Sequence, residues 1–211
     1  MTREEILDRI HHPGIVAIVR SKSPVAFAPL CEALDAGGIR AIEVTMTTPG
    51  ALEAIHSVPE RLRDRIAFGM GTVLGVEDAR NALAAGYQFM VTPVMRLDVV
   101  AFCRERDVPV ACGAFTPTEA QLAYEAGADA IKIFPAEVGG PSYIKSILGP
   151  LPHLKIIPTG GVSLETCKAF LDVGCVALGA GGSLVSEAIL AQGDWEELTR
   201  RARAFVEACR R

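Results

Sequence analysis

The stretch Ala126-Gly-Ala-Asp-Ala-Ile-Lys-Ile-Phe-Pro-Ala-Glu137 holds a short apolar segment with a lysine in its middle. We expect residues 129–134 to form a buried strand. Side chains alternate across a strand, so Lys132 shares one face with Ala130 and Phe134. Burial disfavours the charged form of a lysine, and a neutral lysine is a nucleophile towards carbonyl carbons. These residues alone fit a reactive lysine, a lysine that reaches solvent from a strand end, or one paired with a carboxylate.

Apolar segments of this kind recur along the chain, each followed by a helical pattern. The expected strands cover residues 14–20, 39–45, 65–71, 87–92, 108–112, 129–134, 154–158 and 175–178. The expected helices cover residues 2–11, 23–35, 48–56, 76–85, 96–106, 116–126, 142–148, 163–173, a segment from 183, and 194–210. Several helix starts carry a capping pattern, such as Thr2 with Glu5, or Thr116-Pro-Thr-Glu119.

The eight strand–helix units predict the fold. Their strands are continuously apolar rather than alternating, which is typical of a parallel sheet covered on both faces. Eight such units predict an α/β protein with a closed (β/α)8 TIM barrel and an additional N-terminal helix, as one domain over residues 1–211. The alternative is a doubly wound open sheet. That fold usually has fewer strands and a glycine-rich first loop, whereas the loop here is Arg20-Ser-Lys-Ser-Pro24.

The composition narrows the classes of partner. The 211 residues are 50% hydrophobic and 22% charged with a net charge of -4, and no Lys/Arg run indicates nucleic acid or an anionic membrane. No apolar run has membrane-spanning length, and the first residues are too charged for a signal peptide. The six cysteines show no C-x-x-C spacing, which favours reduced thiols in the cytoplasm. None of the four histidines has a metal-ligand spacing, so we expect no metal.

In barrels of this type the chemistry lies at the C-terminal ends of the strands. The expected strand ends there carry polar or glycine-rich groups: Arg20, Glu43, Thr45, Gly71, Thr72, Thr92, Pro93, Cys112, Gly113, Lys132, Phe134, Thr159, Gly160, Gly161 and residues 179–183. Glu43 alternates with Ile42 and Val44, so it is expected to point into the barrel as Lys132 does. A carboxylate beside a reactive lysine can shuttle protons during imine chemistry. The alternative is a purely structural ion pair.

Two glycine-rich turns predict an anion site. Residues 158–163 and 179–183 end the seventh and eighth strands and precede helices. Glycines let backbone N–H groups approach an anion, and phosphate sites in barrels commonly follow these two strands. Either turn alone could be merely a connection, but the two together indicate a phosphate.

Six motifs taken together resemble one enzyme family. They are Glu43-Val-Thr45, Gly69-Met-Gly-Thr-Val-Leu74, Thr116-Pro-Thr-Glu119, Lys132-Ile-Phe-Pro-Ala-Glu137, Gly149-Pro150 and Pro158-Thr-Gly-Gly161. They resemble the 2-keto-3-deoxy-6-phosphogluconate (KDPG) aldolases, a family that includes enzymes also cleaving 4-hydroxy-2-oxoglutarate. The resemblance covers essentially the whole chain. It implies a class I aldolase acting on a keto-acid sugar phosphate, without a cofactor, in a small barrel that is usually a homotrimer.

The resemblance also implies roles for individual residues. Lys132 would form the Schiff base and Glu43 would be the general acid and base. The remaining substrate-binding positions would be Gly71 and Thr72 at the pyruvyl carboxylate, Pro93 and Phe134 as walls, Thr159 at the end of its strand, and Gly160, Gly161, Gly182 and Ser183 at the phosphate.

One position departs from the family pattern. Many members carry a carboxylate-binding arginine two residues after the threonine of Glu-Val-Thr, where this chain has Thr47. Other members keep an arginine at the end of the first strand, so we expect Arg20 to anchor the substrate carboxylate. The departure leaves open 2-keto-3-deoxy-6-phosphogalactonate as the substrate. The competing functions are a non-covalent phosphate-binding isomerase or synthase and a non-catalytic sugar-phosphate sensor.

Overall fold

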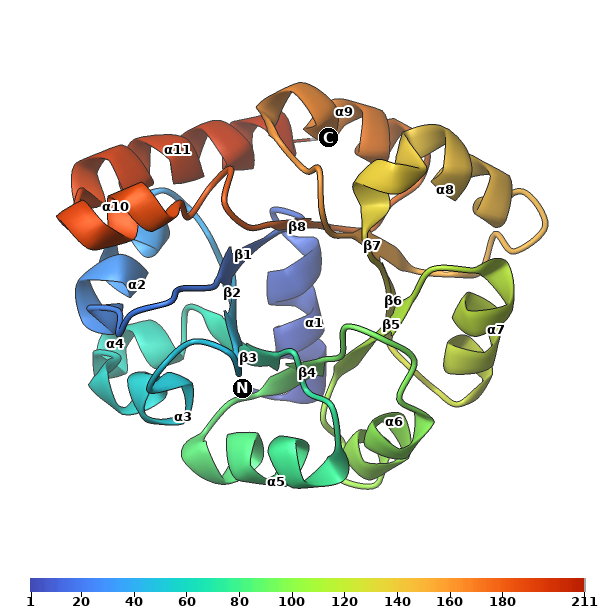
Figure 1. Ribbon diagram of the computed structural model, residues 1–211, viewed down its shortest axis with the longest axis horizontal. Coiled ribbons are helices and arrows are strands. Elements are labelled where there is room, and N and C mark those ends of the chain that lie inside the picture. The colour runs from blue at the N-terminus through green and yellow to red at the C-terminus, as the bar shows by residue number, and fades with distance from the viewer. Residues whose placement is uncertain (211) are drawn as a thin grey trace.

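A computed structural model describes residues 1–210 and confirms the (β/α)8 barrel with an additional N-terminal helix (Figure 1). The strands are β1 (Ile15–Val19), β2 (Ala41–Thr45), β3 (Ala67–Gly71), β4 (Phe89–Val91), β5 (Val110–Ala114), β6 (Ala130–Ile133), β7 (Ile156–Pro158) and β8 (Leu178–Ala180). The α-helices are α1 (Arg3–His11), α2 (Phe27–Ala36), α3 (Ala51–Ala54), α4 (Glu60–Arg63), α5 (Val76–Ala85), α6 (Leu97–Arg104), α7 (Pro117–Glu125), α8 (Gly140–Leu148), α9 (Leu164–Asp172), α10 (Glu187–Gln192) and α11 (Trp195–Ala208). Two 3-10 helices are η1 (Ile55–Ser57) and η2 (Ala136–Val138).

The strands form one parallel sheet in the order β7-β6-β5-β4-β3-β2-β1-β8. A bridge between Thr159, which follows β7, and Gly179 of β8 joins the two ends of this sheet. The ring of strands is therefore closed, and the helices surround it (Figure 1). Within residues 1–210, no helix combines the length and the apolar character needed to cross a bilayer.

Two hydrophobic cores follow from the alternation of side chains. The outer core lies between the strands and the surrounding helices and includes Ile15, Ile42, Ile131 and Ile133. The inner core fills the barrel and is built largely from the opposite faces of the strands: Val16, Ala41, Ala67, Phe89, Val91, Ala130, Ile157 and Ala177. Because strands buried on both faces need apolar residues throughout, their sequences do not alternate.

Helix α1 lies across the N-terminal mouth of the barrel and closes it (Figure 1). Its start is fixed by the predicted capping box, in which Thr2 Oγ1 accepts from the Glu5 N–H while Glu5 accepts from the Thr2 N–H. Ile6 and Ile10 then pack into the inner core. Arg3 pairs with Asp129, the residue before β6, and ties the helix to the barrel wall.

Some element boundaries differ from the prediction. The eighth strand was expected over residues 175–178 but lies at Leu178–Ala180. The Cys175 N–H donates to the Phe170 carbonyl, so Cys175 belongs to the turn that ends α9. Gly179 belongs to the strand, where it pairs with Val16 of β1, and a side chain there would overlap Thr159. Helix α4 was not expected.

Candidate active site

The centre of the site is a buried contact between Lys132 of β6 and Glu43 of β2. Ala130 and Ala41 place the matching faces of these strands in the inner core, so both ionisable side chains point into the barrel. Lys132 Nζ donates to Glu43 Oε1 at 3.3 Å. The two residues are only 5% and 3% exposed. The structure therefore brings together the lysine and the carboxylate expected from the sequence.

Glycines lie beside this pair on the neighbouring strands, and one of them makes room for Glu43. In the sheet register, Lys132 lies beside Gly113 of β5, and Glu43 lies beside Gly69 of β3. A Cβ at Gly71 would overlap the Glu43 carboxylate, and one at Gly113 would overlap the backbone of Pro93. Glu43 can therefore occupy its position only because the end of β3 has no side chain there.

The loop after β3 carries an unusual backbone conformation. Thr72 has a φ of 60°, in the left-handed region that β-branched residues rarely adopt. Such conformations cluster at functional sites, where the surrounding structure imposes them. Thr72 directly follows Gly71, so the strained peptide lies next to the residue that packs against Glu43.

Above the pair, a pocket of about 510 Å³ opens at the C-terminal ends of the strands. It is lined by the predicted residues Arg20, Phe134, Thr159, Gly160, Gly161, Gly182 and Ser183. The volume falls in the range of small-molecule sites. Lys132 Nζ lies 5.8 Å from the centroid of the Phe134 ring, which also lines the pocket. Phe134 thus connects the buried pair with the open pocket.

The two glycine turns meet at one end of this pocket. Gly160 and Gly161 have φ values of 91° and 69°, which favour glycine at both positions. Ser183 Oγ donates to the Val162 carbonyl at 2.7 Å and joins one turn to the other. The N–H groups of Gly160, Gly161, Gly182 and Ser183 make no backbone hydrogen bond within residues 1–210. These four groups are available to an anion in the pocket.

Arg20 and Glu187 are the charged residues that line this pocket in the described part of the chain. Arg20 follows β1 and lines the same pocket as the two glycine turns. Glu187 begins α10 and accepts from the Lys22 N–H at 3.2 Å. The sequence analysis missed Glu187, because an acidic residue in the first turn of a helix is common and carries no functional signal by itself.

Four expected substrate-binding residues lie at the same rim but, in the described chain, do not line this pocket: Thr47, Gly71, Thr72 and Pro93. Thr47 is exposed, and its hydroxyl lies 3.0 Å from that of Thr45. Thr45 in turn lies 3.1 Å from the Thr48 hydroxyl, so short threonine side chains occupy the loop after β2.

The cysteine, histidine and acidic side chains of residues 1–210 form no metal-binding cluster. All six cysteines are buried. Within residues 1–210, no group of three or more His, Cys, Asp or Glu side chains is placed to hold a metal ion.

A family model and the similar known proteins all point to aldolases. Residues 6–201 match the sequence model of the family described as KDPG and KHG aldolase. The chain is 35% identical over 194 residues to a 2-dehydro-3-deoxy-phosphogluconate aldolase of Pseudomonas aeruginosa, covering 92% of this chain and 88% of that protein. It is 34% identical over 198 residues to the 2-dehydro-3-deoxy-6-phosphogalactonate aldolase of Escherichia coli, covering 93% and 94%.

A solved structure of similar fold shows covalent chemistry. It is the KDPG aldolase from Legionella pneumophila, with pyruvate captured as a covalent carbinolamine intermediate. It aligns with a TM-score of 0.83 at 27% identity, covering 91% of this chain and 93% of that one.

Proposed function

Because this chain belongs to the KDPG and KHG aldolase family and is an aldolase, we propose that it cleaves a 2-keto-3-deoxy sugar acid phosphate through a Schiff base on Lys132. The observation that carries this proposal is the buried contact of Lys132 with Glu43, beneath a pocket that ends in free backbone N–H groups. The proposed substrate is KDPG, which yields pyruvate and glyceraldehyde 3-phosphate. The reaction uses the protein's own amine and needs no metal or cofactor.

The proposed reaction proceeds through an imine. Lys132 attacks the C2 ketone, and Glu43 assists loss of water from the carbinolamine through a bound water. The protonated imine then withdraws electrons from C3. Transfer of the C4 hydroxyl proton to Glu43 breaks the C3–C4 bond and releases the aldehyde. The remaining enamine is protonated at C3, and hydrolysis of the pyruvyl imine frees Lys132.

The substrate is proposed to reach from Lys132 into the open pocket, with its phosphate at the two glycine turns. The free N–H groups of these turns suit a phosphate dianion. The backbone at Gly71 and Thr72 would contact the carboxylate end, and Phe134 and Pro93 would form walls. Arg20 was expected at the carboxylate, but its place among the lining of the glycine turns favours the phosphate end.

Two further substrates deserve direct comparison. 4-Hydroxy-2-oxoglutarate would give pyruvate and glyoxylate at the same lysine. The 34% identity to a 2-dehydro-3-deoxy-6-phosphogalactonate aldolase, together with Thr47 in the loop after β2, favours testing the galactonate substrate as well. Turnover of the three purified substrates would rank them.

Borohydride trapping tests the covalent step. The enzyme is incubated with pyruvate, reduced with borohydride and weighed intact by mass spectrometry. We expect one reduced pyruvyl group per chain, absent in Lys132→Ala and retained in Lys168→Ala, which removes an exposed lysine of α9. A non-covalent isomerase or a sensor would gain no adduct. An adduct of normal yield in Lys132→Ala would place the Schiff base on another lysine.

We also propose that the protein is a cytoplasmic homotrimer. The six cysteines have no C-x-x-C spacing and are all buried, which suits a reducing compartment. Exposed apolar side chains follow four successive strands of the barrel, β3 to β6. This surface, called the β3–β6 rim below, consists of Leu74, Val94, Leu97, Phe115 and Val138. Apolar residues gathered on one face are typical of an interface between subunits.

A further inference from the structure

A small cavity of about 30 Å³ lies inside the barrel, on the side of Lys132 that faces away from the open pocket. Helix α1 forms its floor through Leu7, Ile10 and His11. The Lys132–Glu43 pair lines it, and Thr159 and Gly179 line both this cavity and the open pocket. Thr159 and Gly179 therefore stand between the cavity that holds the Lys132–Glu43 pair and the open pocket.

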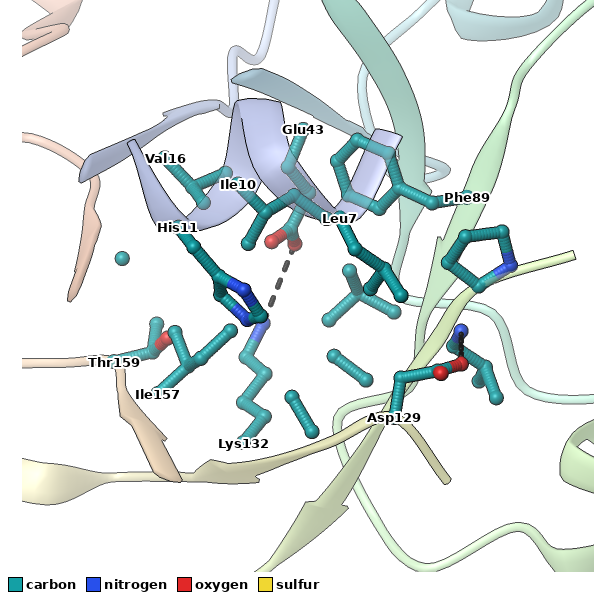
Figure 2. A pocket seen from close by; sticks show the side chains of 16 residues that line it. Leu7, Ile10, His11, Val16, Glu43, Phe89, Asp129, Lys132, Ile157 and Thr159 are labelled. Carbon is teal, nitrogen blue, oxygen red and sulfur yellow. Dashed lines mark hydrogen bonds and ion pairs between the residues drawn. The ribbon is translucent and has the colours of Figure 1, made fainter. Parts of the chain in front are cut away.

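His11 is the polar residue that α1 contributes to this cavity. Figure 2 shows its ring turned from the end of α1 toward Lys132 and Glu43. Its Nε2 is shielded from solvent and has no hydrogen-bond partner within residues 1–210. A buried nitrogen of this kind normally has a partner, because leaving it unpaired costs free energy. The cavity supplies the space in which such a partner can lie.

The surroundings of His11 lower the pKa of its imidazole and so favour the neutral form. Burial, followed by the nearby Lys155 and His12, lowers its pKa, while Asp8 and Asp129 act in the opposite direction. Asp129 is itself paired with Arg3, and His12 contacts Asp8 at 2.8 Å. Across the cavity stand Lys132 and Glu43. A neutral imidazole can accept a hydrogen bond at Nε2, whereas a protonated one cannot.

We propose that a water molecule occupies this cavity and links His11 Nε2 to the Lys132–Glu43 pair, which makes His11 a positioning residue for the reactive amine. The inference rests on the proposed Schiff-base function and deepens it. A cavity of this volume exceeds the 10–15 Å³ or so that one water requires. His11, Lys132, Glu43, Thr159 and Asp129 supply the polar side chains of an otherwise apolar lining, which is enough for the two to four partners that a buried water needs.

This water would form a hydrogen bond with the Lys132 amine from the side of α1. A lysine ammonium has three N–H donors, and Glu43 Oε1 accepts one of them at 3.3 Å. The water accepts a second and passes a hydrogen bond on to His11 Nε2. Hydrogen bonding to the charged form favours that form. Removing the water therefore favours the neutral amine and shifts imine formation toward lower pH.

The test follows the initial rate of pyruvate trapping by a mild borohydride reagent as a function of pH. His11→Leu removes the acceptor, and Leu7→Phe fills the cavity without changing His11. We expect both variants to move the acidic limb of the rate profile to lower pH by about one unit, as for loss of one hydrogen bond to a charged group. His11→Gln keeps a side-chain acceptor and should retain the wild-type profile.

His12→Leu is the matched control, because His12 is adjacent to His11 but 77% exposed in its side chain. Its profile should equal that of the wild type. Wild-type profiles in both His11→Leu and Leu7→Phe would overturn the inference, and so would an equal shift in His12→Leu. If His11→Leu fails to fold by circular dichroism, Leu7→Phe decides alone. Failure of the wild-type protein to trap pyruvate would instead refute the Schiff-base proposal itself.

Discussion

Glu43 reaches Lys132 because Gly71, at the end of β3, has no side chain that would overlap the carboxylate. Gly69, Gly71 and Gly113 stand on β3 and β5, next to the strands that carry the pair. Two charged side chains can share the interior of so narrow a barrel only where their neighbours leave space for them. The small residues at these strand ends are thus as much a part of the site as the two reactive groups.

Gly71→Ala should disable the general base Glu43 although Glu43 itself is not replaced. The new methyl group overlaps Glu43 Oε1, so the carboxylate must move away from Lys132. We expect kcat to fall by about 10²-fold or more, the contribution of a well-placed general acid or base. Gly149→Ala is the control, since its Cβ would make only ordinary contacts, at 3.6 Å or beyond, outside the site. Steady-state kinetics of both variants test this prediction. An unchanged kcat in Gly71→Ala would show that catalysis tolerates a displaced Glu43 carboxylate.

Arg20→Ala identifies the end of the substrate that the guanidinium contacts. The lining of the pocket places Arg20 with the glycine turns, so we expect KM for phosphorylated substrates to rise about 10- to 150-fold, the loss of one charge-assisted contact worth about 1.5–3 kcal/mol. KM for pyruvate and 4-hydroxy-2-oxoglutarate should then change little. An equal rise for all keto acids would instead support the carboxylate anchor expected from the sequence. Lys22→Ala, which removes a neighbouring exposed cation, serves as the control.

At the scale of elements, sequence signals predicted the helix ends best where a capping residue fixes them. Helix α5 lies at residues 76–85 as expected, because Gly86 ends it in a left-handed conformation with φ 107°. The capping boxes of α1 and α7 are present. The boundaries of β8 were wrong because Cys175 and its neighbours are apolar and resemble a strand.

In the site, too, local sequence patterns predicted some features, whereas features that depend on tertiary packing were not predictable. Alternation along β2 and β6 was enough to predict that Glu43 and Lys132 point inward, and a closed barrel brings them together. The cavity beneath them was not predictable. The cavity depends on α1 lying across the barrel mouth, and the amphipathic pattern of α1 does not specify this tertiary arrangement. His11 faces the cavity only because α1 lies there.

Helix α1 should owe part of its docking to Arg3. This side chain contacts Asp129, which is only 9% exposed, and Asp107. Asp129 keeps a hydrogen bond from the Val110 N–H, so Arg3→Ala leaves it partly satisfied. We expect a loss of about 1–2 kcal/mol in the free energy of unfolding, between the values for exposed and buried pairs. Urea denaturation measures it, with Glu4→Ala on the exposed side of α1 as control. A loss no larger than that of the control would mean that Ile6 and Ile10 dock the helix unaided.

On the scale of the whole molecule, the two mouths of the barrel differ. The N-terminal mouth is closed by α1 (Figure 1). The C-terminal mouth holds the open pocket. The β3–β6 rim lies at that open mouth, beside the strands that carry the site. Association through this rim would bring a second subunit close to the pocket while leaving the β7–β8 side, with the glycine turns, free for the substrate.

Val94→Glu should therefore break the proposed trimer. Val94 is 52% exposed and belongs to the β3–β6 rim with Val138, which is 68% exposed. A carboxylate buried in an apolar interface without a partner costs several kcal/mol, and threefold symmetry repeats that cost at each contact. We expect light scattering to give three times 22.4 kDa for the wild type and a mass near 22.4 kDa for Val94→Glu. Leu122→Glu, an exposed leucine on α7 outside the rim, should remain trimeric. A monomeric wild type would contradict the trimer, whereas a trimeric Val94→Glu would move the interface to another face of the barrel.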